Sequence, residues 1–312
     1  MGKTREIKKR IKAVGNIRRI TKTMQMIATA KFSASQQRAV ASKPYTETLF
    51  ELVQQLAAGL GDATHPLLDT TGGTGKGAAR PGRPLTLVLT SDRGLCGPYN
   101  GSVLRSSMVL FRAEPAIRAG EIELVGKKGV NFFKFAGVSV SRQLAQFGDK
   151  PTYELVQALA EEYTRRFVAG EVSTVRVVYM KYVSAGRQVP TTMQILPFQT
   201  AAAGGKAGSA AVVPGSGSAG VTAGGKNLIY EFSPSAEDLL GGLLPAAVKA
   251  LLFQAFNDAV VSEHIARMVA MKAATDNAGK MGKRLTTVYN RARQAQITTE
   301  LTEIISGAAA LE

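Results

Sequence analysis

The fold of this chain is decided by a stretch near the N-terminus, residues 5–28, which reads REIKKRIKAVGNIRRITKTMQMIA. The stretch has no proline and only one glycine, Gly15. Its large apolar side chains recur at steps of three and four: Ile7, Ile11, Val14, Ile17, Ile20, Met24 and Ile27. The mean step is below 3.6 residues, which predicts a helix that supercoils left-handedly around another helix.

The same helical pattern covers residues 1–58, interrupted only by Pro44. At about 1.5 Å per residue, such a helix would be a rod of about 87 Å. A rod of this length does not fit inside one small globule. Pro44 is expected to bend the helix or to loosen it locally.

A second long helix is predicted over residues 233–312. Ser235 and Asp238 resemble a capping box at its start, and no proline follows Pro245. Small and apolar residues then step by 4, 3, 4 and 3 along Met281, Leu285, Val288, Ala292 and Ala295. Each terminal helix lacks another partner for its seam and the two lengths match. The simplest packing is therefore a long antiparallel coiled coil of the N- and C-terminal helices.

Between these helices, residues 85–200 alternate strand and helix patterns. Strands are expected at Leu85–Thr90, Ile122–Val125, Val175–Val183 and, more weakly marked, Met193–Leu196, and helices at Val103–Phe111, Lys127–Phe135 and Pro151–Val168. This alternation predicts a small Rossmann-like α/β domain with a mostly parallel sheet. Residues 201–226 are nearly all Gly, Ala, Ser and Val, and are interpreted as a flexible insertion.

The charge of the chain points to anionic partners. Its 39 Lys and Arg exceed its 23 Asp and Glu, for a formal net charge of +16. Nucleic acid, anionic lipid and acidic protein surfaces all fit such an excess. The chain has no Trp and only 6% aromatic residues, so it offers few platforms for base stacking. No apolar run reaches the roughly 18 residues expected of a membrane span.

No pattern in the sequence predicts catalysis. The only cysteine, Cys96, lies in residues 91–97 (SDRGLCG), where a tight turn is favoured over a nucleophile because no histidine is near in sequence. Thr74-Gly75-Lys76 lacks the spacing of a phosphate-binding loop. We therefore expect no catalytic residue, no metal ligand and no cofactor.

Several segments carry a resemblance to a known family. Residues 17–28 resemble the N-terminal signature of ATP synthase gamma subunits, and residues 91–97 resemble the turn after that family's first strand. Residues 266–278, 289–298 and 300–309 are similar to the family almost residue by residue. The similar segments cover both ends and the domain core, in the family's order.

The resemblance implies a central rotor shaft of F-type ATP synthase. Such a shaft stands inside a hexamer of alternating alpha and beta subunits, and its foot rests on the c-ring with the epsilon subunit. Proton-driven rotation of the ring would change the conformation of the catalytic beta subunits in turn, so that ATP is made. The chain itself would be non-catalytic and peripheral to the membrane, on the cytoplasmic face of a bacterial inner membrane.

The resemblance also assigns partner contacts to individual residues. Those toward the alpha/beta hexamer are Arg293, Gln294 and Thr298 at catalytic-subunit loops, Met24 and Arg267 near the acidic lever segment of beta, and Ile304 and Ile305 at the apolar tip. Tyr230 and Glu231 correspond to the foot that meets the c-ring and epsilon.

The chain departs from the family pattern at residues 59–84 and 201–226. The second departure lies where chloroplast-type gamma subunits carry a regulatory dithiol, and this chain has no cysteine there. Two alternatives remain open from the residues alone. One is a basic coiled coil that binds nucleic acid, and the other is an enzyme that uses the α/β domain.

Overall fold

The computed structural model describes residues 2–59, 65–68, 82–148, 150–198 and 236–309. The interpretation of residues 201–226 as a flexible insertion falls outside this part of the chain. The chain divides into two compact units. Unit 1 joins Met1–Lys31 to Ile265–Glu312, and unit 2 is Phe32–His264.

Two long helices contribute to both units. Helix α1 spans Gly2–Gly59 and helix α6 spans Ala236–Ala309. Each continues through an internal proline, Pro44 in α1 and Pro245 in α6. The loss of one backbone hydrogen bond at each proline is therefore outweighed by the packing of the turns around it.

Unit 2 is built on a five-stranded sheet in the order β3-β2-β1-β4-β5. The strands are β1 (Arg83–Leu89), β2 (Glu121–Val125), β3 (Arg142–Leu144), β4 (Val172–Ser184) and β5 (Arg187–Leu196). All neighbouring pairs are parallel except the β4–β5 hairpin. This confirms the expected mostly parallel, Rossmann-like α/β domain. The strand order reverses between β1 and β4, which is where doubly wound folds commonly bind ligands.

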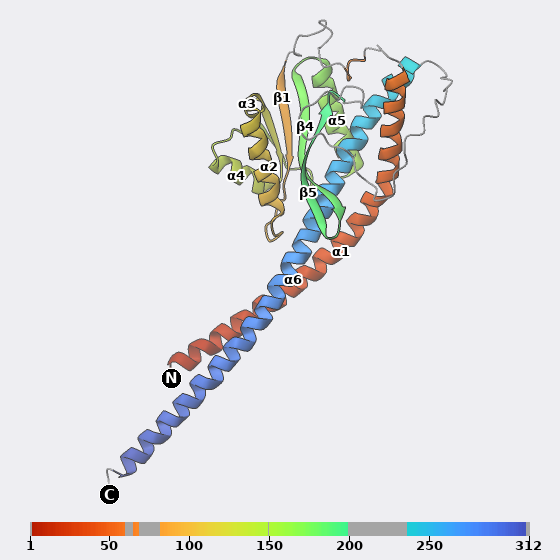
Figure 1. Cartoon of the computed structure of the whole chain (residues 1–312). Coiled ribbons are helices and arrows are strands. Elements are labelled where there is room, and N and C mark those ends of the chain that lie inside the picture. Colours follow the sequence, from red (N-terminus) through yellow and green to blue (C-terminus); the bar gives the residue numbers. More distant parts are fainter. Residues whose placement is uncertain (1, 60–64, 69–81, 149, 199–235, 310–312) are drawn as a thin grey trace. The chain divides into compact units, whose positions relative to one another are not determined.

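Four shorter helices connect the strands: α2 (Tyr99–Ala113), α3 (Pro115–Arg118), α4 (Lys127–Phe135) and α5 (Tyr153–Val168). Helices α2 and α4 lie on one face of the sheet, and α5 lies on the other (Figure 1). The sequence did not indicate α3 or β3, because four and three residues are too few to show a period.

The main core of unit 2 lies between the sheet and the helices on its α5 face. Alternate β1 side chains, Leu85, Leu87 and Leu89, point into it and are at most 2% exposed. Parts of α5, α6 and α1 contribute the rest. The other residues of β1 face α2, as the two-residue period of a strand requires.

Helix α6 is apolar enough, by length and composition, to pass for a membrane span, contrary to the expectation from apolar runs. Its 18-residue window has a mean hydropathy of 1.7, and 44% of that window is buried inside the protein. Leu244, Leu252 and Phe256 of this helix belong to the unit 2 core. The apolarity of α6 is thus partly that of a core helix.

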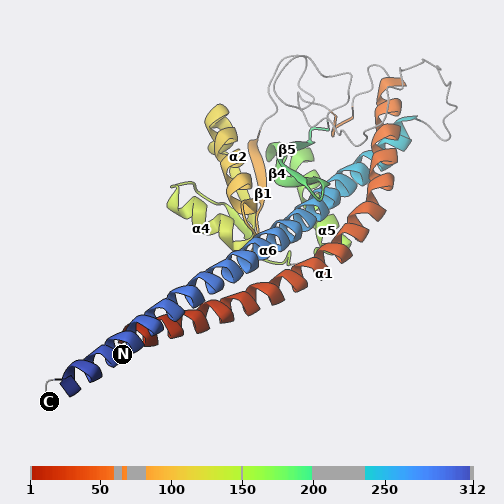
Figure 2. The same ribbon diagram turned by 60° about the horizontal axis from the view of Figure 1, so that its bottom comes forward.

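In unit 1, the two long helices run antiparallel and side by side, with the N- and C-termini at the same end of the pair (Figures 1 and 2). This confirms the antiparallel coiled coil. The residues facing the partner helix are buried or half-buried: Thr4, Ile7, Ile11, Val14, Thr21 and Ala28 of α1, and Thr275, Ala278, Gly282, Leu285, Tyr289, Ala292 and Gln296 of α6.

The predicted seam was wrong for the larger aliphatic residues. Ile17, Ile20 and Ile27 are 52%, 60% and 52% exposed, and on α6 Met281 and Val288 are 55% and 50% exposed. The heptad that starts at Ile7, Ile11 and Val14 continues through Arg18, Thr21, Gln25 and Ala28. Each exposed isoleucine lies one residue before this series, about 100° around the helix.

Candidate partner-binding surfaces

The seam of unit 1 is small and polar at its centre. The Thr275 hydroxyl donates a hydrogen bond to the Thr21 hydroxyl over 2.9 Å, and both residues are at most 9% exposed. A Cβ atom at Gly279 would lie 3.6 Å from the Arg18 Nε. Gly279 therefore faces the Arg18 side chain across the seam at an ordinary van der Waals distance. Ile7, Ile11, Val14 and Leu285 are half-buried along the seam, whereas Ile17, Ile20 and Ile27 point away from this part of it.

Those side chains form an apolar stripe on α1, defined here as Ile17, Ile20, Met24 and Ile27. Their steps of 3, 4 and 3 place them on one face of the helix. The isoleucines are more than half exposed and Met24 is half-buried. A continuous apolar stripe on an otherwise polar helix is typical of a surface that another chain covers.

A basic groove lies in the same unit, with a volume of about 830 Å³. Its charged lining consists of five cations and one carboxylate, namely Lys12, Arg18, Arg19, Lys22, Lys272 and Asp276. Asn16, Thr23 and Gln25 add hydrogen-bonding groups. The groove therefore suits an acidic protein segment or another anion.

The structure places most of the predicted contact residues on the open surface of α6. Arg293, Gln294 and Thr298 are exposed, and the Thr298 hydroxyl donates to the Gln294 carbonyl over 3.0 Å. Ile304 and Ile305 are 72% and 60% exposed.

Helix α6 continues beyond its pairing with α1. The last described contact between them is the hydrogen bond from the Thr4 hydroxyl to the Gln296 side-chain oxygen, at 3.1 Å. The following turns hold further exposed apolar residues at Ile297 and Leu301. The sequence reasoning did not single out these two, although their spacing with Ile304 indicates one apolar face.

Two other predicted sites have different outcomes. Arg267 is half-buried on α6. Tyr230 and Glu231 lie outside the described residues. Met24 and Arg267 both belong to unit 1.

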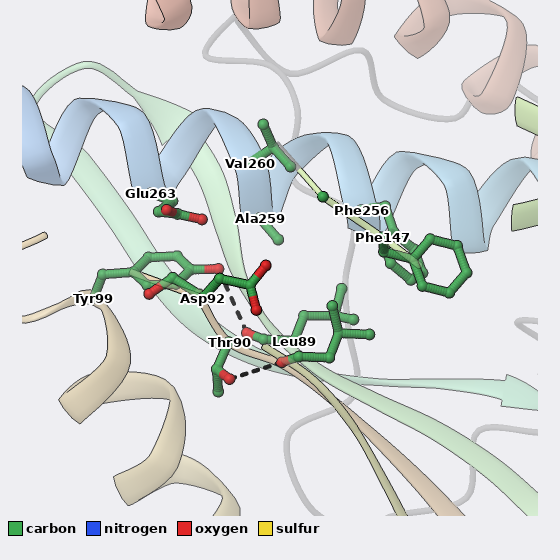
Figure 3. Close-up of a pocket in the computed structure, with 12 residues that line it drawn as sticks. Leu89, Thr90, Asp92, Tyr99, Phe147, Phe256, Ala259, Val260 and Glu263 are labelled. Atoms are coloured by element: carbon green, nitrogen blue, oxygen red, sulfur yellow. Dashed lines mark hydrogen bonds between the residues drawn. The ribbon is translucent and has the colours of Figure 1, made fainter. Parts of the chain in front are cut away.

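The ligand-binding crevice expected of a doubly wound sheet is nearly filled in this chain. At the carboxyl end of β1, the cavity next to Thr90 and Asp92 measures about 30 Å³, the size of one water molecule (Figure 3). Helix α6 lines it with Phe256, Ala259 and Val260. The space that a nucleotide occupies in other proteins of this topology is taken by the chain's own helix.

Cys96 is part of a tight turn, as the sequence indicated. It is 2% exposed, and the backbone on either side turns through positive φ, 63° at Leu95 and 55° at Gly97. The Asn100 amide donates to its Sγ over 3.2 Å, and the Ser91 Oγ lies 3.7 Å away. Neither neighbour is a base that could generate a thiolate.

The class of protein is defined by two features: a pair of long antiparallel helices in unit 1 with exposed apolar and basic surfaces, and a small α/β domain in unit 2. The family model described as ATP synthase matches residues 3–311. The chain therefore belongs to the ATP synthase gamma chain family, as its full-length relatives show.

The relatives match over 100% of both chains. They include the ATP synthase gamma chains of Rhodopirellula baltica, 41% identical, and Desulfitobacterium hafniense, 36% identical. Among solved structures, a chain of the Euglena gracilis mitochondrial ATP synthase in rotational state 3 has a TM-score of 0.63 at 19% identity. That match covers 99% of this chain and 95% of the Euglena chain. A rotor chain of the same enzyme in rotational state 1 has a TM-score of 0.57 at 18% identity, covering 95% of this chain and 99% of the other. These structures establish the fold.

Proposed function

We propose that this chain is the central rotor shaft of an F-type ATP synthase. It would transmit proton-driven rotation of a c-ring to the catalytic beta subunits of an alpha/beta hexamer. The observation that carries the proposal is the inverted packing of unit 1. The centre of the seam holds the polar pair Thr21 and Thr275, while Ile17, Ile20 and Ile27 are more than half exposed. A rod built in this way has surfaces for other chains along its length.

Each surface suits a different contact. The basic groove would meet acidic segments of the hexamer, with Met24 and Arg267 near the lever segment of beta. Arg293, Gln294 and Thr298 would bind loops of catalytic subunits. Ile304 and Ile305 would lie in an apolar sleeve. Tyr230 and Glu231 would meet the c-ring and epsilon. Coupling requires that these contacts differ between rotary states, because a ligand shifts an equilibrium only by its differential affinity.

The chain would have no catalytic activity of its own. The nearly filled crevice at the β1–β4 switch point supports this, and the two side chains that contact the Cys96 Sγ, Asn100 and Ser91, are not bases. ATP chemistry would belong to the partner subunits. The complex would place the chain on the cytoplasmic face of a bacterial inner membrane, peripheral to the bilayer.

The experiment is a paired substitution in the assembled complex. Arg293→Ala with Gln294→Ala should slow ATP turnover while the isolated chain stays folded. Arg has several donors and Gln has both a donor and an acceptor, so together they can bind a polar loop in one rotary state and release it in another. A charged hydrogen bond made in only one state is worth about 1.5–3 kcal/mol, or about a ten- to hundredfold change.

The chain offers a matched control. Arg187→Ala with Gln188→Ala removes the same residue pair from the start of β5, where Arg187 is exposed and Gln188 is half-buried, and should leave turnover unchanged. Equal turnover of both double variants, in complexes assembled to the same yield, would contradict the contact. Steep salt-dependent DNA binding by the isolated chain, with no association with alpha and beta subunits, would favour the nucleic-acid alternative.

A further inference from the structure

A polar layer interrupts the apolar packing of unit 2 where α1, α6 and β4 meet. Its centre is Asp258 of α6, which is 6% exposed. The Gln254 amide donates to the Asp258 Oδ1 over 2.9 Å, and the Ser42 hydroxyl of α1 donates to the Gln254 Oε1 over 3.0 Å. The backbone N–H of Tyr182 in β4 also donates to Asp258. The Asp258 carboxyl thus contacts β4 directly and is linked to α1 through the Gln254 side chain.

At 6% exposure, the Asp258 carboxyl has little access to water. Leu252, Ala255 and Ala259 of α6 are at most 5% exposed, as is Ala39 of α1. A buried carboxylate is costly unless a cation is paired with it.

The charged groups that face Asp258 come from both neighbouring elements. Helix α1 contributes Lys43 and β4 contributes Lys181, and Glu47 of α1 interacts with Lys181. Among the described residues, neither lysine forms an ion pair with Asp258, and Lys43 pairs instead with Glu47 over 3.5 Å. The phenols of Tyr179 and Tyr182 in β4 are the other titratable groups that interact with it. The two lysines therefore reduce the cost of ionising Asp258 without removing it.

Burial dominates the protonation of this layer. It raises the pKa of Asp258 from its ordinary value of 3.8 to about 7, although the Gln254 hydrogen bond and the two lysines act in the opposite direction. Burial likewise lowers the pKa of Lys181. When α1 separates from α6 and β4, water reaches Asp258 and its pKa returns toward 3.8.

We propose that this polar layer is a proton-operated clamp, in which a neutral Asp258 holds α1 and β4 against α6 and its ionisation loosens α1. The sign follows from the higher pKa of the closed form. Between about pH 4 and pH 7 the open form is ionised and the closed form is not, so opening becomes about tenfold more favourable with each pH unit. Above pH 7 both forms are ionised and the dependence levels off. The clamp does not rest on the proposed rotary function.

Amide hydrogen exchange of the full-length chain between pH 5 and pH 8 tests the proposal. Exchange rates in residues 35–50 of α1, divided by the intrinsic rate at each pH, report local opening. We expect this ratio to rise about tenfold per pH unit up to pH 7 and then to become constant. Helix α2, on the opposite face of the sheet, is the internal reference and should show no such rise.

Two variants separate the clamp from general effects of pH. Asp258→Asn has nearly the same shape and no ionisation, so its ratio should be independent of pH. Asp276→Asn removes an exposed carboxylate from the same helix and should behave like the wild type. A flat ratio in the wild type, or a slope that survives in Asp258→Asn, would overturn the proposal. Should Asp258→Asn fail to fold, the wild-type ratio of α1 against α2 still decides the question.

Discussion

The two units of this chain bury opposite kinds of side chain. In unit 2, large residues such as Leu85, Phe111 and Phe167 are at most 2% exposed. In unit 1, the seam centres on a threonine pair, Thr21 and Thr275, and the neighbouring Ile17, Ile20 and Ile27 are exposed. Unit 2 therefore has its own hydrophobic core, whereas the apolar surface of unit 1 is available to other chains.

The two units also differ in how their charged side chains are paired. In unit 2, Arg166 pairs with Glu121 over 2.6 Å and with Glu171 over 3.2 Å. In unit 1, the basic groove brings five cations together with one carboxylate. Like charges held this close repel each other, so an acidic partner would relieve a repulsion that the chain does not relieve itself.

The largest expected effect comes from truncating one apolar residue in each unit. Phe256 is 3% exposed and lies 4.7 Å from the Phe147 ring centroid, so Phe256→Ala should lower the free energy of unfolding by about 3–5 kcal/mol. Ile20→Ala, at a side chain 60% exposed, should change it by less than about 0.5 kcal/mol. Urea denaturation of the full-length chain measures both. Similar losses would mean that the units do not differ in this way.

A smaller effect is expected in the buried ionic network of unit 2. The Tyr163 hydroxyl donates to the Glu123 Oε2 over 2.6 Å, and Glu123 is 2% exposed. Burial raises the pKa of Glu123. Tyr163→Phe removes the donor but keeps the ring, and should cost about 1–3 kcal/mol because a buried acceptor loses its partner. The exposed phenol of Tyr45 supplies the control, since Tyr45→Phe should leave the urea midpoint unchanged.

The seam of unit 1 should tolerate the replacement of its polar pair by apolar residues. Thr21→Val with Thr275→Val replaces both partners of one hydrogen bond by apolar groups of the same shape. Such replacements are nearly neutral or stabilising, so local opening of residues 14–28 should change by less than about 1 kcal/mol in hydrogen exchange. A loss of several kcal/mol would show that the polar pair, and not close backbone packing, stabilises the seam.

The sequence predicted the architecture because its signals were long. Each terminal helix contains a single proline, and β4 is a 13-residue segment rich in β-branched and aromatic residues. Single-residue facing was harder to predict. The sequence showed the helical period of Ile17, Ile20 and Ile27. Their predicted position in the contact between the two long helices, however, rested on hydrophobicity alone. It could not show that Thr21 would take the seam, because its hydrogen-bond partner Thr275 lies on a helix more than 250 residues away.

The functional residues likewise differ in whether the sequence alone could indicate them. Similarity to a family pointed to Arg293 and Gln294 individually, whereas the basic groove forms only when α1 and α6 pair. The Asp258 layer was not visible in the sequence either, because a lone aspartate in an apolar helix carries no sign of what faces it.

The central claim is that the exposed aliphatics of unit 1 serve partners and not the fold. The triple variant Ile17→Ala, Ile20→Ala and Ile27→Ala tests it directly, because all three side chains are more than half exposed and alanine favours helices. The account predicts an unchanged free energy of unfolding for the isolated chain, together with a loss of assembly or of ATP turnover in the complex with alpha and beta subunits. A destabilised chain, or a complex that assembles and turns over normally, would contradict it.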